Sequence, residues 1–379
     1  MKVNDFKRIR EKIMDVMRLR ELDQLIGTTI STPVNTGGIQ FLEYPALKNT
    51  AAEFRSSMAS DGIQYSEDES IIAAVCMSIL NESDALDSTP AFVIDAIARN
   101  GRVFREDDFS SNPYLKLTHF PQERCGDYEL GYAEYRKREV VMYDDPALVG
   151  NIVEIPRIGF IEKRFRYPLI AENKCTWMSV SPNEICTMQK HIDQAAGKVL
   201  TLGLGMGYYA LMASEKESVE SVTIVDKAPE VIKLFMKYIL PQFPHKEKIN
   251  IINADAFEYL ASLQDGVFDY CFADTWKGNL DPVPYLKMRQ LGHRFSQMKM
   301  SYWIEESMVL TFMGIVFMLI LDGFYKSAGI PNPGIDEKLM SPDNMYTWNL
   351  LNERLKDVVI SRPEQIDYFI DYRNVIKMI

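Results

Sequence analysis

The fold of this chain is indicated where a strand-forming run meets a glycine-rich turn, at Val199-Leu200-Thr201-Leu202-Gly203-Leu204-Gly205-Met206-Gly207. The apolar run predicts a buried strand over 199–202, and the residues after Gly207 predict a helix. Glycines in such a turn let the backbone bend sharply and let a ligand approach the main chain. An ordinary tight strand-to-helix turn would use the same residues, so the turn alone does not establish a ligand site.

Strand and helix patterns alternate after this turn. Short apolar runs at 222–225, 249–252 and 268–273 predict three further strands with helical segments between them. This order predicts a parallel sheet with crossover helices, an α/β Rossmann-like domain over 181–326 with helices on both faces. Ligands of such sheets bind outside the carboxyl ends of the strands, so residues at those ends are the candidates for a site.

Acidic residues follow three of these strands. Asp226 ends the second strand, 23 residues after Gly203, where a carboxylate can accept hydrogen bonds from both ribose hydroxyls of a nucleoside. Asp255 follows the third strand, where it could accept the exocyclic amine of adenine beside the N–H of Ala256. Asp226 and Asp255 could equally cap the helices that follow them. Asp274 ends the fourth strand, and the shared location of all three acids favours one nucleoside site.

Residues 175–325 resemble the class I S-adenosylmethionine-dependent methyltransferases and, within them, the spermidine synthase branch. The resemblance rests on the glycine turn, on Asp226, on the pair Asp255-Ala256 and on Asp274. It implies S-adenosylmethionine as cofactor and the following cofactor-binding residues: Gly203, Leu204, Gly205, Met206, Gly207, Asp226, Lys227, Asp255, Ala256, Asp274 and Thr275. Asp274 is also the candidate catalytic residue, which would orient or deprotonate the nucleophile unless it holds the amine of the cofactor.

Two departures from the spermidine synthase pattern bear on the reaction. Met206 stands where those enzymes carry an Asp, and Lys277 stands where they carry a second acid after the one matching Asp274. Both changes favour methyl transfer to a small-molecule acceptor over aminopropyl transfer to a polyamine, which needs carboxylates. An aminopropyltransferase, or an inactive nucleoside-binding protein on the same fold, remains the alternative. A nicotinamide dinucleotide site would leave Asp255 and Asp274 less well explained.

Three aromatic residues near the expected site have two interpretations. Trp276 would line the cofactor or acceptor pocket, or pack in the core. Tyr208 and Tyr209 would close over the methionine part of the cofactor, or belong to the core.

The helical start and the C-terminal tail resemble no known family, whereas the β unit between the start and the Rossmann-like domain resembles the small N-terminal sheet of spermidine synthases. We expect a helical N-terminal domain over 1–125, a small antiparallel β unit over 126–180 and a helical tail over 327–379. Capping boxes predict helix starts at Thr50 with Glu53 and at Ser66 with Glu69.

Composition restricts the function classes. The chain has 379 residues, 47% of them apolar, and a formal net charge of −11, which argues against disorder and against non-specific nucleic-acid binding. Its first 20 residues are basic and predict an amphipathic helix with a solvated basic face, or else a membrane-surface or nucleic-acid contact. Five scattered cysteines and four isolated histidines suggest neither disulfides nor a metal site.

The longest apolar run, 308–321, is short of a membrane span and predicts a buried helix or strand. We therefore expect a cytoplasmic enzyme with no membrane or nucleic-acid partner. Spermidine synthases tend to associate, so the resemblance leaves a homo-oligomer open.

Overall fold

The computed structural model describes residues 1–4, 7–329 and 341–379. Its central sheet has five parallel strands in the order β13-β12-β11-β14-β15. The strands are β11 (Gly197–Leu202), β12 (Val219–Asp226), β13 (Ile249–Asn253), β14 (Tyr270–Ala273) and β15 (Lys299–Tyr302). The predicted α/β parallel sheet is confirmed. The fifth strand, β15, was missed because its four residues, Lys-Met-Ser-Tyr, show no strand-like apolar run.

The direction in which strands are added reverses beside β11. The chain passes from β11 outward to β12 and β13, and then returns to place β14 on the other side of β11. This reversal is the topological switch point at which open α/β sheets bind ligands. The helices that accompany the sheet are α8 (Pro182–Gln194), α9 (Tyr208–Ser214), α10 (Pro229–Leu234), α11 (Ala256–Ser262) and α12 (Pro282–Gly292). A π-helical turn, Phe235–Ile239, continues α10.

The region before the sheet holds two small sheets and a hairpin. The antiparallel sheet β10-β9-β4-β3 consists of β3 (Glu123–Cys125), β4 (Tyr128–Tyr135), β9 (Phe165–Glu172) and β10 (Cys175–Ser179). The second sheet contains β2 (Arg102–Phe104), β5 (Glu139–Met142) and β8 (Ile158–Ile161), and the hairpin contains β6 (Ala147–Val149) and β7 (Val153–Ile155). Strand β2, from the expected helical domain, thus pairs in parallel with β8 from the expected β unit.

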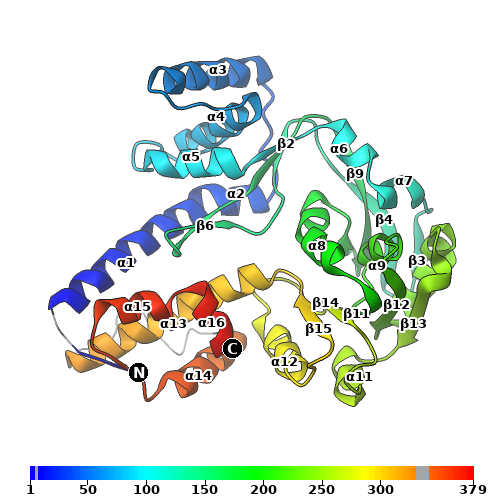
Figure 1. The fold of residues 1–379 in the computed structure, drawn as a ribbon. Coiled ribbons are helices and arrows are strands. Elements are labelled where there is room, and N and C mark those ends of the chain that lie inside the picture. The colour runs from blue at the N-terminus through cyan, green and yellow to red at the C-terminus, as the bar shows by residue number, and fades with distance from the viewer. Residues whose placement is uncertain (5–6, 330–340) are drawn as a thin grey trace.

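The N-terminal region is otherwise helical (Figure 1). It contains α1 (Lys7–Ile26), the π-helical turn Gly27–Ser31, α2 (Thr32–Asn35), α3 (Tyr44–Ser60), α4 (Glu67–Glu82), α5 (Ala91–Asn100), α6 (Glu106–Ser110) and α7 (Pro113–Leu117). The capping box of Ser66 with Glu69 is confirmed at the start of α4. The start predicted at Thr50 is wrong, because α3 begins at Tyr44 with Pro45 in its first turn.

The apolar run 308–321 lies within α13 (Glu305–Ser327), a helix of 23 residues. It is the one helix of the described residues that is long and apolar enough to cross a membrane, and 56% of its most apolar window is buried inside the protein. Helices α14 (Pro342–Leu355), α15 (Pro363–Phe369) and α16 (Tyr372–Met378) pack against it. Strand β1 (Lys2–Val3) contacts α13 and pairs with β16 (Val359–Ile360), so the two ends of the chain meet (Figure 1).

Candidate functional site

The glycine turn between β11 and α9 requires glycine for steric reasons. Gly203 has a φ of +106°, and a Cβ there would lie 2.1 Å from the backbone oxygen of Asp274. Gly207 has a φ of +72°, and a Cβ there would lie 2.3 Å from the ring of Phe235. The turn and the end of β14 are therefore in backbone contact at the switch point of the sheet.

Asp226 holds the glycine turn in place. Its side chain is 8% exposed, its Oδ2 accepts a hydrogen bond of 2.9 Å from the N–H of Leu204, and its Oδ1 accepts one of 2.8 Å from the N–H of Ala228. The N-cap of α10 is Ala228, so the capping interpretation of Asp226 does not hold in its strict form. Each carboxylate oxygen has a second acceptor position, which leaves the carboxylate able to accept from a ribose as well.

Asp255 is a helix cap. It is the N-cap of α11, and its Oδ1 accepts from the N–H groups of Phe257 and Glu258 at 2.9 and 3.1 Å. Lys227, after Asp226, is exposed. The capping interpretation of Asp255 is therefore correct, and any adenine contact would have to use its other oxygen.

A small cavity lies against the turn. Of the predicted site residues, the structure brings five to its wall: Gly203, Leu204, Gly205, Met206 and Asp274. The other six lie outside the wall: Gly207, Asp226, Lys227, Asp255, Ala256 and Thr275. Tyr208 and Tyr209 also line it, together with Met178, Ser179, Val180, Met188, Thr201 and Phe272. The cavity measures about 20 Å³, room for about one water molecule.

Met178, on strand β10, closes this cavity over the turn. A Cβ at Gly205 would lie 2.9 Å from the Cε of Met178, so the thioether end rests on the glycine backbone. Ligand pockets are typically about 300–1,000 Å³. The cavity as it stands is thus too small for such a ligand, and the flexible side chain of Met178 is part of its wall.

Asp274 and Glu184 form a pair of acidic groups that the sequence did not reveal. Burial, with the nearby charge of Asp226, raises the pKa of Asp274 to about 7. Burial, with the charge of Asp274, raises the pKa of Glu184 well above its ordinary value. The Oε2 atom of Glu184 is buried and has no hydrogen-bond partner among the described residues. Asp274 is therefore partly protonated at neutral pH, and the raised pKa of Glu184 favours its neutral form.

The sequence signal at Glu184 indicated a different role. Ser181 and Glu184 have the spacing of a capping box at the start of α8. Ser181 is the N-cap, but its side chain makes no capping hydrogen bond. The Glu184 carboxyl is instead electrostatically coupled to Asp274, a contact that depends on how α8 packs against β14.

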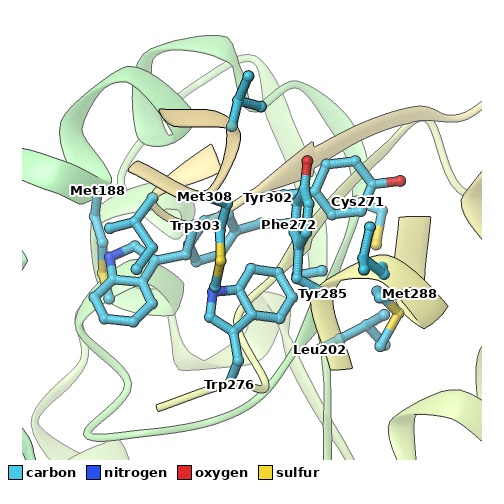
Figure 2. Packing of buried hydrophobic residues seen from close by; sticks show 14 of the residues in the cluster. Met188, Leu202, Cys271, Phe272, Trp276, Tyr285, Met288, Tyr302, Trp303 and Met308 are labelled. Atoms are coloured by element: carbon cyan, nitrogen blue, oxygen red, sulfur yellow. The ribbon is translucent and has the colours of Figure 1, made fainter. Parts of the chain in front are cut away.

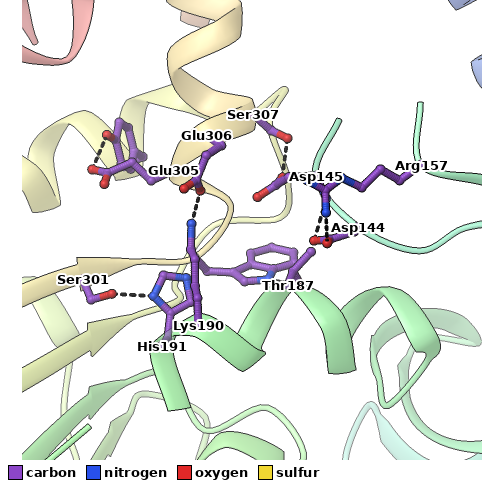
Figure 3. Close-up of polar contacts among 12 residues, drawn as sticks. Asp144, Asp145, Arg157, Thr187, Lys190, His191, Ser301, Glu305, Glu306 and Ser307 are labelled. Carbon is purple, nitrogen blue, oxygen red and sulfur yellow. Dashed lines mark hydrogen bonds and ion pairs between the residues drawn. The ribbon is translucent and has the colours of Figure 1, made fainter. Parts of the chain in front are cut away.

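Polar contacts along α8 fix its position (Figure 3). His191 shares a hydrogen bond with Ser301 of β15, and Lys190 forms an ion pair with Glu306 of α13. The indole N–H of Trp303 donates to Thr187 at 3.0 Å. Burial lowers the pKa of His191 to about 3, so its ring is neutral and acts as a structural contact.

The aromatic residues near Asp274 mostly belong to the core (Figure 2). Trp276 is 5% exposed and packs edge-on against Tyr285, with ring centroids 5.4 Å apart. Tyr209 stacks on Phe272 at 4.3 Å. Thr275 Oγ1, Trp276 Nε1 and the Tyr209 hydroxyl are buried without a hydrogen-bond partner among the described residues. Packing thus explains Trp276.

The described residues contain no group of three or more His, Cys, Asp or Glu side chains that could hold a metal ion.

Residues 165–291 match the family model described as O-methyltransferase. The match begins in β9 and ends in α12, so it contains the turn and all three acids. The expected resemblance to class I methyltransferases is confirmed for this segment. No curated protein matches the chain.

Several solved structures overlap with part of the chain. One is the spermidine synthase from Thermotoga maritima, with 18% identity and a TM-score of 0.28 over 39% of this chain and 58% of that chain. A spermidine synthase bound to the transition-state analogue AdoDATO has 18% identity and a TM-score of 0.30 over 39% and 59%. A probable spermidine synthase from Corynebacterium glutamicum has 19% identity and a TM-score of 0.25 over 30% and 45%. The chain thus spans 45–59% of these proteins, and scores this low do not define a shared activity.

Proposed function

We propose that the protein is an S-adenosylmethionine-dependent methyltransferase with a small-molecule acceptor, starting from the match of residues 165–291 to the O-methyltransferase family model. One observation carries the proposal: the Gly203 turn, held by Asp226, meets Asp274 at the switch point of the sheet. Glycine backbone and a carboxylate at adjacent strand ends are the groups that a nucleoside cofactor needs.

The residues at the turn fit this cofactor in chemistry. The turn from Gly203 to Gly207 and the carboxylate of Asp226 would hold its nucleoside part, and Met178 would have to give way. The buried Oε2 of Glu184, which lacks a partner, is a polar atom that a bound cation or hydroxyl would satisfy. When bound, S-adenosylmethionine supplies a methyl group on a sulfonium that is already a good leaving group.

The chain's own contribution is to orient the acceptor and to move a proton. With its pKa raised to about 7, Asp274 can accept a proton from the acceptor at neutral pH. The raised pKa of Glu184 favours its neutral form, whose O–H could donate a hydrogen bond to a bound group. The second role for Asp274, holding the cofactor's amine, remains the alternative.

Aminopropyl transfer is the second candidate, and Glu184 favours it. Lys277, which stands where spermidine synthases carry a second acid, is exposed, so its charge is a weaker argument against a polyamine substrate. Glu184 adds to the site a carboxyl group that the sequence pattern lacked. A bound amine cation would favour the ionised form of both carboxyls and could pair with them in either reaction.

Calorimetry with S-adenosylmethionine and with its decarboxylated form tests the choice between the two. We expect the intact form to bind more tightly; tighter binding of the decarboxylated form would establish the aminopropyltransferase alternative. A protein that binds either compound but never turns it over with any acceptor pool would be the inactive nucleoside-binding protein. Absence of binding to both would overturn the proposal.

We further propose a cytoplasmic location, an acceptor that is not a nucleic acid and no membrane partner. The net charge of −11 supports the exclusion of nucleic acid. The contacts of α13 with α14, α15, α16 and β1 support its role as a core helix. Homo-oligomer formation can be tested by light scattering.

A further inference from the structure

A second and larger cavity lies between α6, α7 and the β8–β9 connection. It measures about 230 Å³ and shares no wall residue with the cavity at the glycine turn. Phe109, Leu115 and Phe165 form its apolar part, and the rings of Phe109 and Phe165 stack at 3.7 Å. Lys116, Lys163 and Arg164 stand at its rim and are exposed.

The charge of this cavity is opposite to that of the protein. Its wall carries four basic side chains and one acidic one, Glu106, in a chain of net charge −11. Glu106 pairs with Lys163 at 2.5 Å, and Arg105, the fourth basic residue, is held by Asp68 through two hydrogen bonds. Arg164 forms a longer, exposed ion pair of 3.6 Å with Glu134, for which an anionic ligand would have to compete. Lys116 forms no ion pair with any residue in the described ranges, so its ammonium group is available to an anion.

We propose that this cavity binds a small amphiphilic anion, one aromatic ring or an equivalent apolar group that carries a single anionic head. The apolar part would contact Phe109, Leu115 and Phe165, and the head would meet Lys116 and Arg164. A cavity of about 150 Å³ holds a benzene molecule, so about 230 Å³ has room for one ring and part of its head group. Lysine and arginine bind such heads through charge-assisted hydrogen bonds.

Helix α7 connects this cavity to the glycine turn. Leu115 packs against the main core as well as against the Phe109–Phe165 cluster. The preceding residue, Tyr114, is fully buried, and its hydroxyl donates to the backbone oxygen of Met206 at 2.6 Å. Asn112, the N-cap of α7, donates to the hydroxyl of Tyr208 at 3.1 Å. An anion that orders α7 therefore also orders the turn, and this coupling is reciprocal by thermodynamic linkage.

Calorimetry with phenyl phosphate tests the site directly and does not depend on the proposed function. Phenyl phosphate should bind about tenfold more tightly than inorganic phosphate, which lacks the ring, or benzyl alcohol, which lacks the anionic head. The double variant Lys116→Ala/Arg164→Ala should weaken binding about fivefold. The matched control Arg55→Ala/Lys287→Ala removes two exposed charges elsewhere and should leave binding unchanged.

Three results of this titration would overturn the proposal: no saturable binding, equal affinity for inorganic phosphate, or equal weakening in both double variants. Hydrogen exchange tests the connection to the turn. Phenyl phosphate should slow amide exchange in the peptide over 203–209, and Tyr114→Phe, which deletes the hydroxyl but leaves the contact of Asn112 with Tyr208, should reduce the slowing while binding persists. Unaltered exchange in the wild-type protein, or full slowing in Tyr114→Phe, would refute the coupling.

Discussion

The carboxylate of Asp226 accepts a hydrogen bond from the backbone N–H of Leu204, 2.9 Å away. This contact joins the end of β12 to the turn that follows β11, two neighbouring strands of the parallel sheet. The residue predicted to bind ribose therefore also shapes the turn beside which the ribose would lie. Loss of the carboxylate affects both functions.

Asp226→Ala should weaken S-adenosylmethionine binding by about 1–3 kcal/mol and lower the melting temperature, because the buried N–H of Leu204 and the partly buried N–H of Ala228 lose their acceptor. Glu220→Ala is the matched control, since it removes an exposed carboxylate from the opposite end of the same strand. Calorimetry and thermal denaturation give the two readouts. Unchanged affinity in Asp226→Ala would remove the ribose role.

Asp274→Asn distinguishes the two roles of that residue. If Asp274 is the base, the variant should lose about 10²–10⁴-fold in rate and keep its cofactor affinity. The wild-type rate should rise with pH up to an apparent pKa near 7, and the variant should lose this dependence. Asp61→Asn, at an exposed position, is the control. A fall in affinity with no change in the pH profile would assign Asp274 to the cofactor's amine instead.

The same residue makes folding stability depend on pH. Between about pH 4 and pH 7, folded Asp274 retains a proton that the unfolded chain releases, because its pKa is raised from 3.8 to about 7. The free energy of unfolding should therefore fall as pH rises through this window, and Glu184 contributes with the same sign. Urea denaturation of Asp274→Asn should show a smaller loss of stability from pH 5 to pH 8. Identical losses of stability in the variant and the wild-type protein would contradict the raised pKa of Asp274.

Met178→Ala should increase cofactor affinity. The side chain of Met178 rests on Gly205 and must move before a nucleoside can enter, so its removal raises the fraction of binding-competent protein. Met318→Ala, at a partly buried position on α13, controls for the general loss of a methionine. Calorimetric affinity that is unchanged or weaker in Met178→Ala would show that this side chain does not obstruct the site.

Glycine substitutions should form a graded series in stability. Gly62 has a φ of +81° and no atom within 4 Å of an added Cβ, so Gly62→Ala should cost about 1–2 kcal/mol from backbone strain alone. Gly205→Ala adds a contact with the flexible end of Met178, and Gly203→Ala adds a clash with the backbone of Asp274. We expect melting temperatures to fall in that order. Equal losses at Gly62 and Gly203 would contradict the close approach of the turn to β14.

The local pattern of the chain was sufficient for the α/β sheet, for the position of the glycine turn and for the three acids at strand ends. Alternation of apolar strands and helices has a period that is visible in the sequence, and parallel strands bring their carboxyl ends to one edge. The short strand β15 was not predicted because its four residues show no such period. The start of α3 was predicted wrongly because Pro45, rather than a capping box, lies in its first turn.

Packing between distant segments decided the rest. The charge of Asp274, at the end of β14, acts on the carboxyl group of Glu184 on α8. Met178 on β10 lies against Gly205 in the glycine turn. Both pairs join separate elements of the chain. Strand β2 pairs with β8, and β1 pairs with β16. Both pairings cross the domain boundaries that the sequence pattern predicted. Such contacts depend on how helices and sheets fit together in three dimensions, and neither hydrophobic period nor residue type encodes that fit locally. A carboxyl group raised in pKa by its surroundings is therefore found only once those surroundings are assembled.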